Sequence, residues 1–196
     1  MWRRAVIALV ALAAAMPEPA RAQRKVQQRK PADYDDTFRK YSKRFFGPAY
    51  DWKLFKAQGM TESNLDMAAR SRVGARGVMQ LMPSTFSSIQ SENDELKWID
   101  DPHMNIAAGI QYDRKLWLLW EADSITDHRT EFMFGSYNAG RRTLLRAQGL
   151  ARRSKLDPRT WPSIRTVAPQ VPRWRHKETL DYVERIRAAR EGMERP

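Results

Sequence analysis

Cysteine is absent from this chain of 196 residues, and histidine occurs only three times. Without cysteine the chain can form no disulfide and can carry no lipid on a cysteine. His103, His128 and His176 are scattered without the spacing of metal ligands, so we expect no metal site and no cofactor. Stability must come from the packing of apolar side chains, to which seven tryptophans contribute large areas.

Long apolar runs are also missing. The run at residues 5–16 is 12 residues long, whereas a helix needs roughly 20 apolar residues to cross a bilayer. Two arginines precede this run, and an Ala-Arg-Ala cleavage pattern follows at residues 20–22. We therefore predict that residues 1–22 are a signal peptide cleaved after Ala22, which favours an exported protein over one with a permanent transmembrane anchor.

Acidic residues are scarce relative to basic ones, with 23 Asp and Glu against 35 Lys and Arg. Removal of residues 1–22 takes away three Arg and one Glu, so the formal net charge falls from +12 to +10. Such a charge favours polyanions, including nucleic acid, acidic lipid and an anionic cell wall. Export and the absence of a recognisable nucleic-acid-binding module argue against nucleic acid, so an anionic cell-envelope surface is the expected partner.

Residues 23–34 are polar and basic, with almost no side chains to bury, and we predict a disordered arm. The arm either contacts an anionic envelope surface or serves as a solvated linker. The remaining residues, 35–196, are enough for one domain with a single core.

Apolar residues at three-to-four spacing predict a mainly α domain, without a convincing strand or internal repeat. Cap residues, prolines and glycines place the expected helices; these begin near Asp35, Asp51, Pro83, Asp101 and Thr126 or Asp127, and the last spans Glu178–Glu191. Residues 149–176 contain four Pro, two Trp and many basic side chains. We predict that they form a long loop before the last helix, with at most short helical turns.

Glu62 is the candidate catalytic residue. It falls near the C-terminal end of a predicted helix, where the backbone dipole disfavours a negative charge and helps to raise the pKa of a carboxyl group. Polar and glycine-rich segments follow at Gly77–Gln80, Ser136–Gly140 and Glu178–Val183. One carboxyl group with such segments around it suggests acid–base chemistry on a neutral, hydroxyl-rich substrate. Alone, Glu62 would be read as a solvated helix residue.

These segments together resemble the catalytic domain of the lytic murein transglycosylases, which is related to goose-type lysozyme. The resemblance runs from about Asp51 to Ile186, and residues 141–176 match it only loosely. The matching motifs are Glu62-Ser63, Ser71–Gln80, Asp101–Tyr112, Ser136–Gly140 and Glu178–Val183. Val78 and Ser136 are small departures, because the family has Leu and Ala at these positions.

The resemblance implies a lysozyme-like fold and a periplasmic enzyme that cleaves peptidoglycan between N-acetylmuramic acid and N-acetylglucosamine. It also implies that Glu62 is the sole catalytic carboxyl. Glu62 would first protonate the glycosidic oxygen and then accept the proton of the muramic C6 hydroxyl as that group attacks C1. The product is a 1,6-anhydro end, and no water is consumed.

The resemblance also suggests substrate-binding or supporting residues: Ser63, Met79, Gln80, Tyr137, Asn138, Glu178 and Tyr182. Ser63 either caps the backbone or positions Glu62, and Tyr137 is either core or a partner of the acid. The amides of Gln80 and Asn138 suit an N-acetyl group, although Asn138 also fits a helix-end cap. We expect conformational roles for Gly74, Gly77 and Gly140.

Two alternatives remain. Asp66, four residues after Glu62, is either a turn residue or the second carboxylate of a hydrolase, which would make the protein a muramidase; Asp100 and Asp101 are further candidates. A glycan-binding or scaffold protein without catalysis would keep the groove but would not depend on Glu62.

Overall fold

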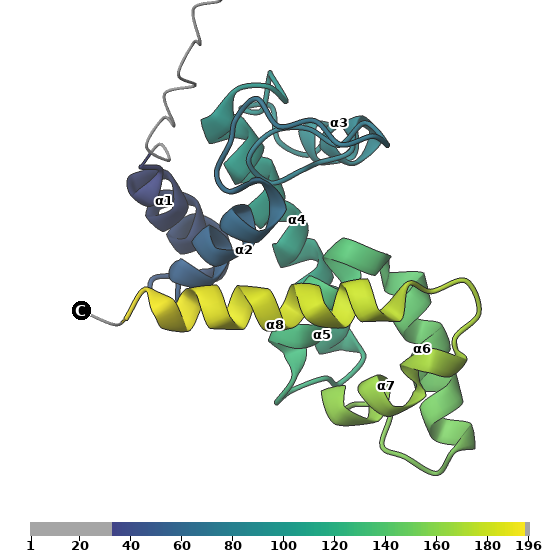
Figure 1. Cartoon of the computed structure of the whole chain (residues 1–196). Coiled ribbons are helices and arrows are strands. Elements are labelled where there is room, and N and C mark those ends of the chain that lie inside the picture. Colours follow the sequence, from purple (N-terminus) through teal and green to yellow (C-terminus); the bar gives the residue numbers. More distant parts are fainter. Residues whose placement is uncertain (1–32, 195–196) are drawn as a thin grey trace, which may run out of the picture. The chain divides into compact units, whose positions relative to one another are not determined.

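The computed structural model describes residues 33–194, so the predicted signal peptide and nearly all of the predicted basic arm lie outside the described residues. Within this range the chain forms helices and isolated bridges without a strand, which confirms the mainly α prediction. The helices are α1 (Asp35–Phe46), α2 (Lys53–Ser63), α3 (Pro83–Gln90), α4 (Pro102–Ala122), α5 (Arg129–Ala139), α6 (Arg141–Arg153), α7 (Trp161–Val167), the 3-10 helix η1 (Ala168–Gln170) and α8 (His176–Gly192) (Figure 1).

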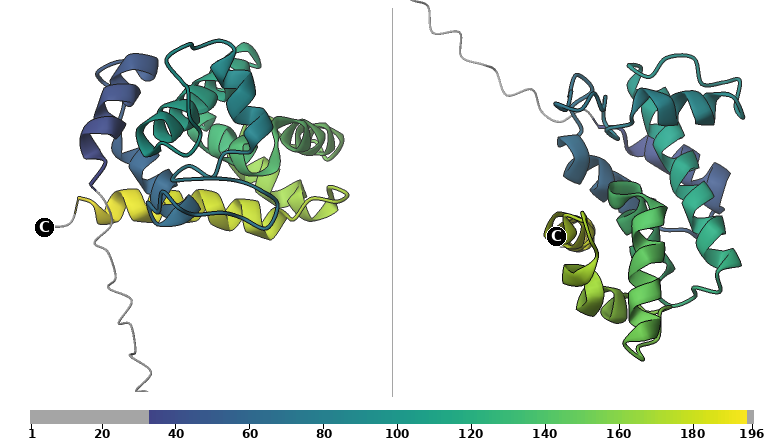
Figure 2. Two further views of the ribbon diagram at one scale, coloured as in Figure 1. Left: turned by 90° about the horizontal axis from the view of Figure 1, so that it is seen from above. Right: turned by 90° about the vertical axis from the view of Figure 1, so that its right-hand side faces the viewer.

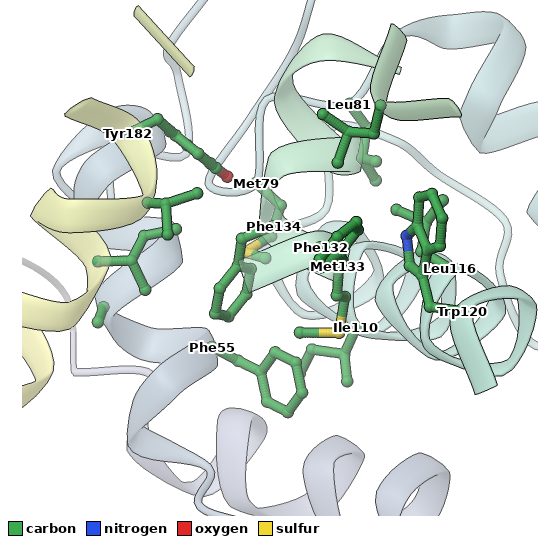
Figure 3. Packing of buried hydrophobic residues seen from close by; sticks show 14 of the residues in the cluster. Phe55, Met79, Leu81, Ile110, Leu116, Trp120, Phe132, Met133, Phe134 and Tyr182 are labelled. Carbon is green, nitrogen blue, oxygen red and sulfur yellow. The ribbon is translucent and has the colours of Figure 1, made fainter. Parts of the chain in front are cut away.

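Helices α4 and α5 pack against each other, and further helices pack against one or the other of them. Helices α1 and α3 contact α4, while α6 and α8 contact α5. Helix α8 also packs against α2, which lies next to it in Figure 2, so the last helix of the domain reaches the helix that carries Glu62. The side chains of Phe55, Ile110 and Phe132 belong to the buried core between these helices (Figure 3).

Several predicted helix ends are confirmed. Asp101 caps α4, because its Oδ1 accepts a hydrogen bond of 2.8 Å from the Met104 backbone N–H, and Pro102 is the first helical residue. Gly140 ends α5 with a φ of 78°. The predicted cap at Thr126 or Asp127 is wrong, since α5 begins only at Arg129.

The prediction of a long loop at residues 149–176 is wrong in detail. Helix α6 continues to Arg153, and α7 and η1 occupy residues 161–170. Thr160 caps α7 by accepting a hydrogen bond of 3.4 Å from the Ser163 backbone N–H, and Pro162 lies in the first turn, where a proline removes no helical hydrogen bond. Trp161 and Ile164 are buried. Pro162 therefore marks the beginning of a helix and does not interrupt one.

The folded domain begins slightly before the predicted boundary. Tyr34, the last residue of the predicted arm, is buried, and its ring packs edge-on against His103 with centroids 5.8 Å apart. Its backbone carbonyl accepts a hydrogen bond of 2.9 Å from the Phe38 N–H. Among the described helices, none is long and apolar enough to cross a membrane.

Candidate active site

Glu62 lies on the last turn of α2 and is half-buried. The hydroxyl group of Tyr182, a buried residue of α8, donates a hydrogen bond of 2.6 Å to Glu62 Oε1. Burial raises the pKa of Glu62 to about 7, while the Tyr182 hydrogen bond and the positive charge of Arg185 act to lower it. Both protonation states of Glu62 are therefore accessible near neutral pH, as a group that serves as acid and then as base requires.

The backbone turns sharply after Ser63. Asn64 and Leu65 both have left-handed φ angles, of 55° and 62°. The Leu65 N–H donates a hydrogen bond of 3.3 Å to the carbonyl of Gly59, and this bond closes the end of α2. A side chain at Gly59 would crowd Leu65, because a Cβ there would lie 3.1 Å from Leu65 Cδ2. The turn fixes where α2 ends and hence where Glu62 lies.

Two hydroxyl groups hold the backbone of the Gly77–Gln80 segment next to Glu62. Ser63 Oγ donates a hydrogen bond of 2.8 Å to the carbonyl of Val78. The Tyr137 hydroxyl donates one of 2.8 Å to the carbonyl of Met79. Ser63 and Tyr137, both predicted from the sequence, thus meet at one segment of backbone and support the loop beside the acid.

Asn105 of α4 holds the same segment from the other direction, and the sequence analysis did not select it as a site residue. Its Oδ1 accepts a hydrogen bond of 2.8 Å from the Met79 N–H, and its Nδ2 donates to the carbonyls of Arg76 at 3.0 Å and Ile99 at 2.9 Å. Gly77 has a φ of 72°, and a Cβ there would lie 2.7 Å from Asn105 Nδ2. Asn105 can approach so closely only because residue 77 is glycine.

Gly74 and Gly140 also have positive φ angles, of 93° and 78°. The side chain of Met79, which the resemblance suggested as a substrate-binding or supporting residue, is fully buried against Gly109. The Gln80 side-chain Nε2 donates to the carbonyls of Gly77 at 2.9 Å and Ala69 at 3.3 Å. Its amide nitrogen therefore holds the loop.

Asn138 is exposed at the end of α5 and is oriented by two residues on or next to α8. The indole N–H of Trp174 donates a hydrogen bond of 2.9 Å to Thr179 Oγ1, whose hydroxyl donates one of 2.8 Å to Asn138 Oδ1. Because Oδ1 accepts this bond, the amide group of Asn138 turns its Nδ2 donors away from Thr179.

The contact of Glu178 is with Arg175 and not with Tyr182. Glu178 is exposed and forms an ion pair of 2.9 Å with Arg175. Together with Asp181, Glu184 and Arg185 it lines a surface hollow of about 480 Å³ on α8. Glu178 thus lies on the exposed side of α8 and pairs with Arg175, and within the described part of the chain no hydrogen bond or ion pair joins it to Tyr182.

Asp66 occupies an exposed turn, as one of its two readings predicted. Its Oδ1 accepts a hydrogen bond of 2.8 Å from the Ala68 N–H, which is typical of a turn residue. Asp100 forms ion pairs with Arg70 at 2.9 Å and Arg76 at 3.5 Å. Both carboxylates are thus engaged in the local structure of the loop.

Asp113 of α4 is the carboxyl group that the sequence analysis missed. It is fully buried, and Gln58 Nε2 donates a hydrogen bond of 3.5 Å to its Oδ1. Burial raises the pKa of Asp113 well above its ordinary value, and the negative charge of Glu62 raises it further. The available signal was its spacing, because Asp113 follows the apolar Ile106 and Ile110 on the buried face of the helix.

Fold and site together define a helical domain built around one titratable acid at the end of a helix. Residues 38–158 match the family described as Transglycosylase SLT domain. Since this match covers more than half of the chain, the chain belongs to that family. The match confirms the resemblance inferred from the motifs.

Relatives with this domain are considerably longer proteins. The chain is 31% identical over 162 residues to membrane-bound lytic murein transglycosylase F of Vibrio cholerae, a match that covers 76% of this chain and 28% of that protein. It is 33% identical over 147 residues to the protein of the same name from Pseudomonas putida, covering 74% of this chain and 28% of the relative. The chain thus spans less than a third of the length of these relatives.

Solved structures show the same fold. The 70 kDa soluble lytic transglycosylase SLT70 from Escherichia coli superposes with a TM-score of 0.61 at 23% identity, covering 82% of this chain and 24% of that one. A complex of the 70-kDa soluble lytic transglycosylase with bulgecin A superposes with a TM-score of 0.60 at 22% identity, covering 84% of this chain and 25% of that one. The fold class is therefore the lysozyme-like one that the sequence predicted.

Proposed function

We propose that this protein is a peptidoglycan lytic transglycosylase that cleaves the β-1,4 bond between N-acetylmuramic acid and N-acetylglucosamine without water. The observation that carries the proposal is the state of Glu62, a half-buried carboxyl with a pKa of about 7 and a hydrogen bond from Tyr182. Membership of the SLT family and the names of the relatives support the substrate.

In the proposed mechanism Glu62 acts twice. The protonated carboxyl donates its proton to the glycosidic oxygen as the bond from that oxygen to C1 breaks. The resulting carboxylate then accepts the proton of the muramic C6 hydroxyl, whose oxygen forms the new bond to C1. The products are a 1,6-anhydro end and a free hydroxyl, and Glu62 is protonated again. The Tyr182 hydroxyl stabilises the carboxylate between the two steps.

Other features fit a polymeric glycan that carries anionic groups. The Nδ2 donors of Asn138, which is oriented by Thr179, suit the carbonyl of an N-acetyl group. The formal net charge of +10 that remains without residues 1–22 favours residence on an anionic wall. A signal peptide at residues 1–22 would deliver the domain of residues 35–196 to the periplasm, and the arm at residues 23–34 would add contacts with the envelope surface.

The muramidase alternative needs a second carboxylate that activates water. Asp66 is the sequence candidate, but it is exposed and engaged in a turn with Ala68. Burying the Glu62 carboxyl group raises its pKa to about 7 and costs stability. A binding or scaffold protein would gain nothing from this group that offsets the cost.

The test is a digestion of purified peptidoglycan by the protein and by its E62Q variant, followed by mass spectrometry of the released fragments. We expect anhydro ends from the wild type and a loss of at least about a hundredfold in E62Q. Reducing ends, heavier by one water, would identify a hydrolase. Equal release by both proteins would remove Glu62 from the mechanism, and release by neither would favour the binding protein.

A further inference from the structure

Two buried oxygen atoms near Glu62 lack hydrogen-bond partners among the described residues, and both belong to one pair of side chains. They are Oδ2 of Asp113 and Oε1 of Gln58. Both residues are fully buried, one on α4 and the other on α2. The two side chains share a hydrogen bond of 3.5 Å from Gln58 Nε2 to Asp113 Oδ1. Buried acceptors without a donor are costly, so the pair requires an explanation.

A single proton removes both deficits. An ionised carboxylate has only acceptors, and the oxygen of a glutamine amide is also an acceptor, so neither can satisfy the other. When Oδ2 of Asp113 carries a proton, it becomes a donor for Oε1 of Gln58, and the Nε2–Oδ1 bond completes a cyclic acid–amide pair. Exchanging the two atoms of the amide leaves the same need, because the amide oxygen still requires a donor.

The charges near the pair, as far as the structure describes them, also favour the protonated form of Asp113. Four tyrosines have pKa values that the charge of an ionised Asp113 would raise, which places them near it: Tyr50, Tyr112, Tyr137 and Tyr182. Among the described residues, the charged side chain that acts on Asp113 is Glu62, and its negative charge favours protonation. The positive charge of Arg114 acts to lower the pKa of Tyr50, and that of Arg185 acts to lower the pKa of Glu62.

Gln58 links this pair to the acid, because it precedes Glu62 by four residues on α2. Residues four apart lie one turn apart on the same face of a helix. A buried bond that fixes Gln58 against α4 therefore also fixes the turn that ends in Glu62.

We propose that Asp113 keeps its proton while Glu62 cycles between acid and base, and that the Asp113–Gln58 pair is a positioning device for Glu62. The role of the pair rests on the proposed function of Glu62, but the protonation of Asp113 does not. Asp113 is then no second catalytic carboxylate, and Glu62 is the one carboxyl of this cluster that changes its charge.

The protonation of Asp113 can be measured without any assay of activity. In protein labelled with ¹³C at aspartate carboxyls, the Asp113 signal is assigned as the one missing from D113N. We expect it to hold the chemical shift of a protonated carboxyl from about pH 5 to about pH 8, far above the ordinary aspartate range. A move to the carboxylate shift within that window would overturn the proposal, whatever Glu62 does.

Positioning is tested with three variants assayed on glycan strands. D113L leaves both polar atoms of Gln58 buried without partners, and we expect kcat to fall about tenfold with little change in KM. D113N can still donate to Oε1 and accept from Nε2, so it should restore kcat to within about threefold and keep the pH midpoint of Glu62. A midpoint moved to lower pH in D113N would show that Asp113 is charged in the wild type and would overturn the proposal.

The double variant D113L/Q58L guards against a simple folding defect, because replacing both partners with apolar groups leaves no unpaired polar atom. We expect it to fold as well as the wild type while kcat stays low. Recovery of full kcat in this variant would reduce the pair to a structural role. If instead E62Q remains active, the proposed function fails while the carboxyl signal of Asp113 still decides its protonation.

Discussion

The two sides of the candidate active site are built by different means. On the loop side, residues 76–81 are held by side chains that bind their backbone, chiefly those of Asn105, Ser63 and Tyr137. On the α8 side, Tyr182 and Thr179 extend from a helix whose position is set by packing. A backbone held in this way tolerates little change, whereas a helix can lose one polar contact and keep its place. We therefore expect all-or-none effects on the loop side and graded effects on the α8 side.

The strongest test of the loop side is G77A. Gly77 has a φ of 72°, and the added Cβ would lie 2.7 Å from Asn105 Nδ2. Strain and collision together should lower the free energy of unfolding by about 3 kcal/mol or more, measured by chemical denaturation. G74A separates the two causes, since residue 74 has a φ of 93° but open space around it, and it should cost only about 1–2 kcal/mol.

Gly149 provides the matched control for these substitutions. It lies within α6, and a Cβ there would meet only Arg153 Nη1 at 3.7 Å. G149A should therefore be neutral or stabilising, because alanine is the better helix former. If G77A unfolds at the same denaturant concentration as G149A, the loop side is not rigid and the contrast between the two sides fails.

The acid between the two sides should itself reduce stability at high pH. Glu62 has a pKa of about 7 in the folded protein against 4.5 for an ordinary glutamate, so folding takes up a proton between these values. The folded state therefore loses stability as the pH rises through this window, by at most about 3 kcal/mol. E62Q carries no charge and should be more stable than the wild type at about pH 8 but not at about pH 4. If E62Q and the wild type differ by the same free energy of unfolding at both pH values, the raised pKa is contradicted.

Much of the helical framework follows from local signals. Asp101-Pro102 and Gly140 mark the beginning of α4 and the end of α5 because caps and positive φ angles are properties of single residues. The region after α6 was misjudged because proline signals both a break and a first turn. Only the burial of Trp161, a tertiary fact, distinguishes the two in α7.

The site was predictable where motifs carry it and less so where helices meet. Glu62, Ser63 and Tyr137 were selected from the motifs, and the structure brings Ser63 and Tyr137 to one segment of backbone. Asp113 and Gln58 were missed because each is an unremarkable polar residue until the fold brings the two side chains within hydrogen-bond distance. Sequence spacing can place a polar residue on a buried face, but it cannot name its partner on another helix.

Y182F should have a moderate effect on the α8 side. The lost hydroxyl donates to Glu62 Oε1 and acts to lower the pKa of that carboxyl, so the pKa of Glu62 should rise further and the pH profile of cleavage should move to higher pH. We expect kcat to fall about tenfold, since the carboxylate formed between the two steps loses a donor.

Y137F is the control from the loop side. The Tyr137 hydroxyl donates to the carbonyl of Met79, not to Glu62, so its loss should reduce stability and leave the pH midpoint in place. A shift of the midpoint in Y137F equal to that in Y182F would mean that the two sides act on Glu62 alike.

The smallest expected effect is that of T179V, which keeps the shape of residue 179 and removes its hydroxyl. Trp174 then loses an acceptor and Asn138 loses the donor that orients its amide. Because the acid is untouched, we expect KM for glycan strands to rise about fivefold, equivalent to about 1 kcal/mol, with an unchanged pH midpoint. T179S keeps the hydroxyl and should retain the wild-type KM. A fall in kcat without a change in KM would mean that Asn138 acts on the reacting bond, so the α8 side would be part of the chemistry and not only of binding.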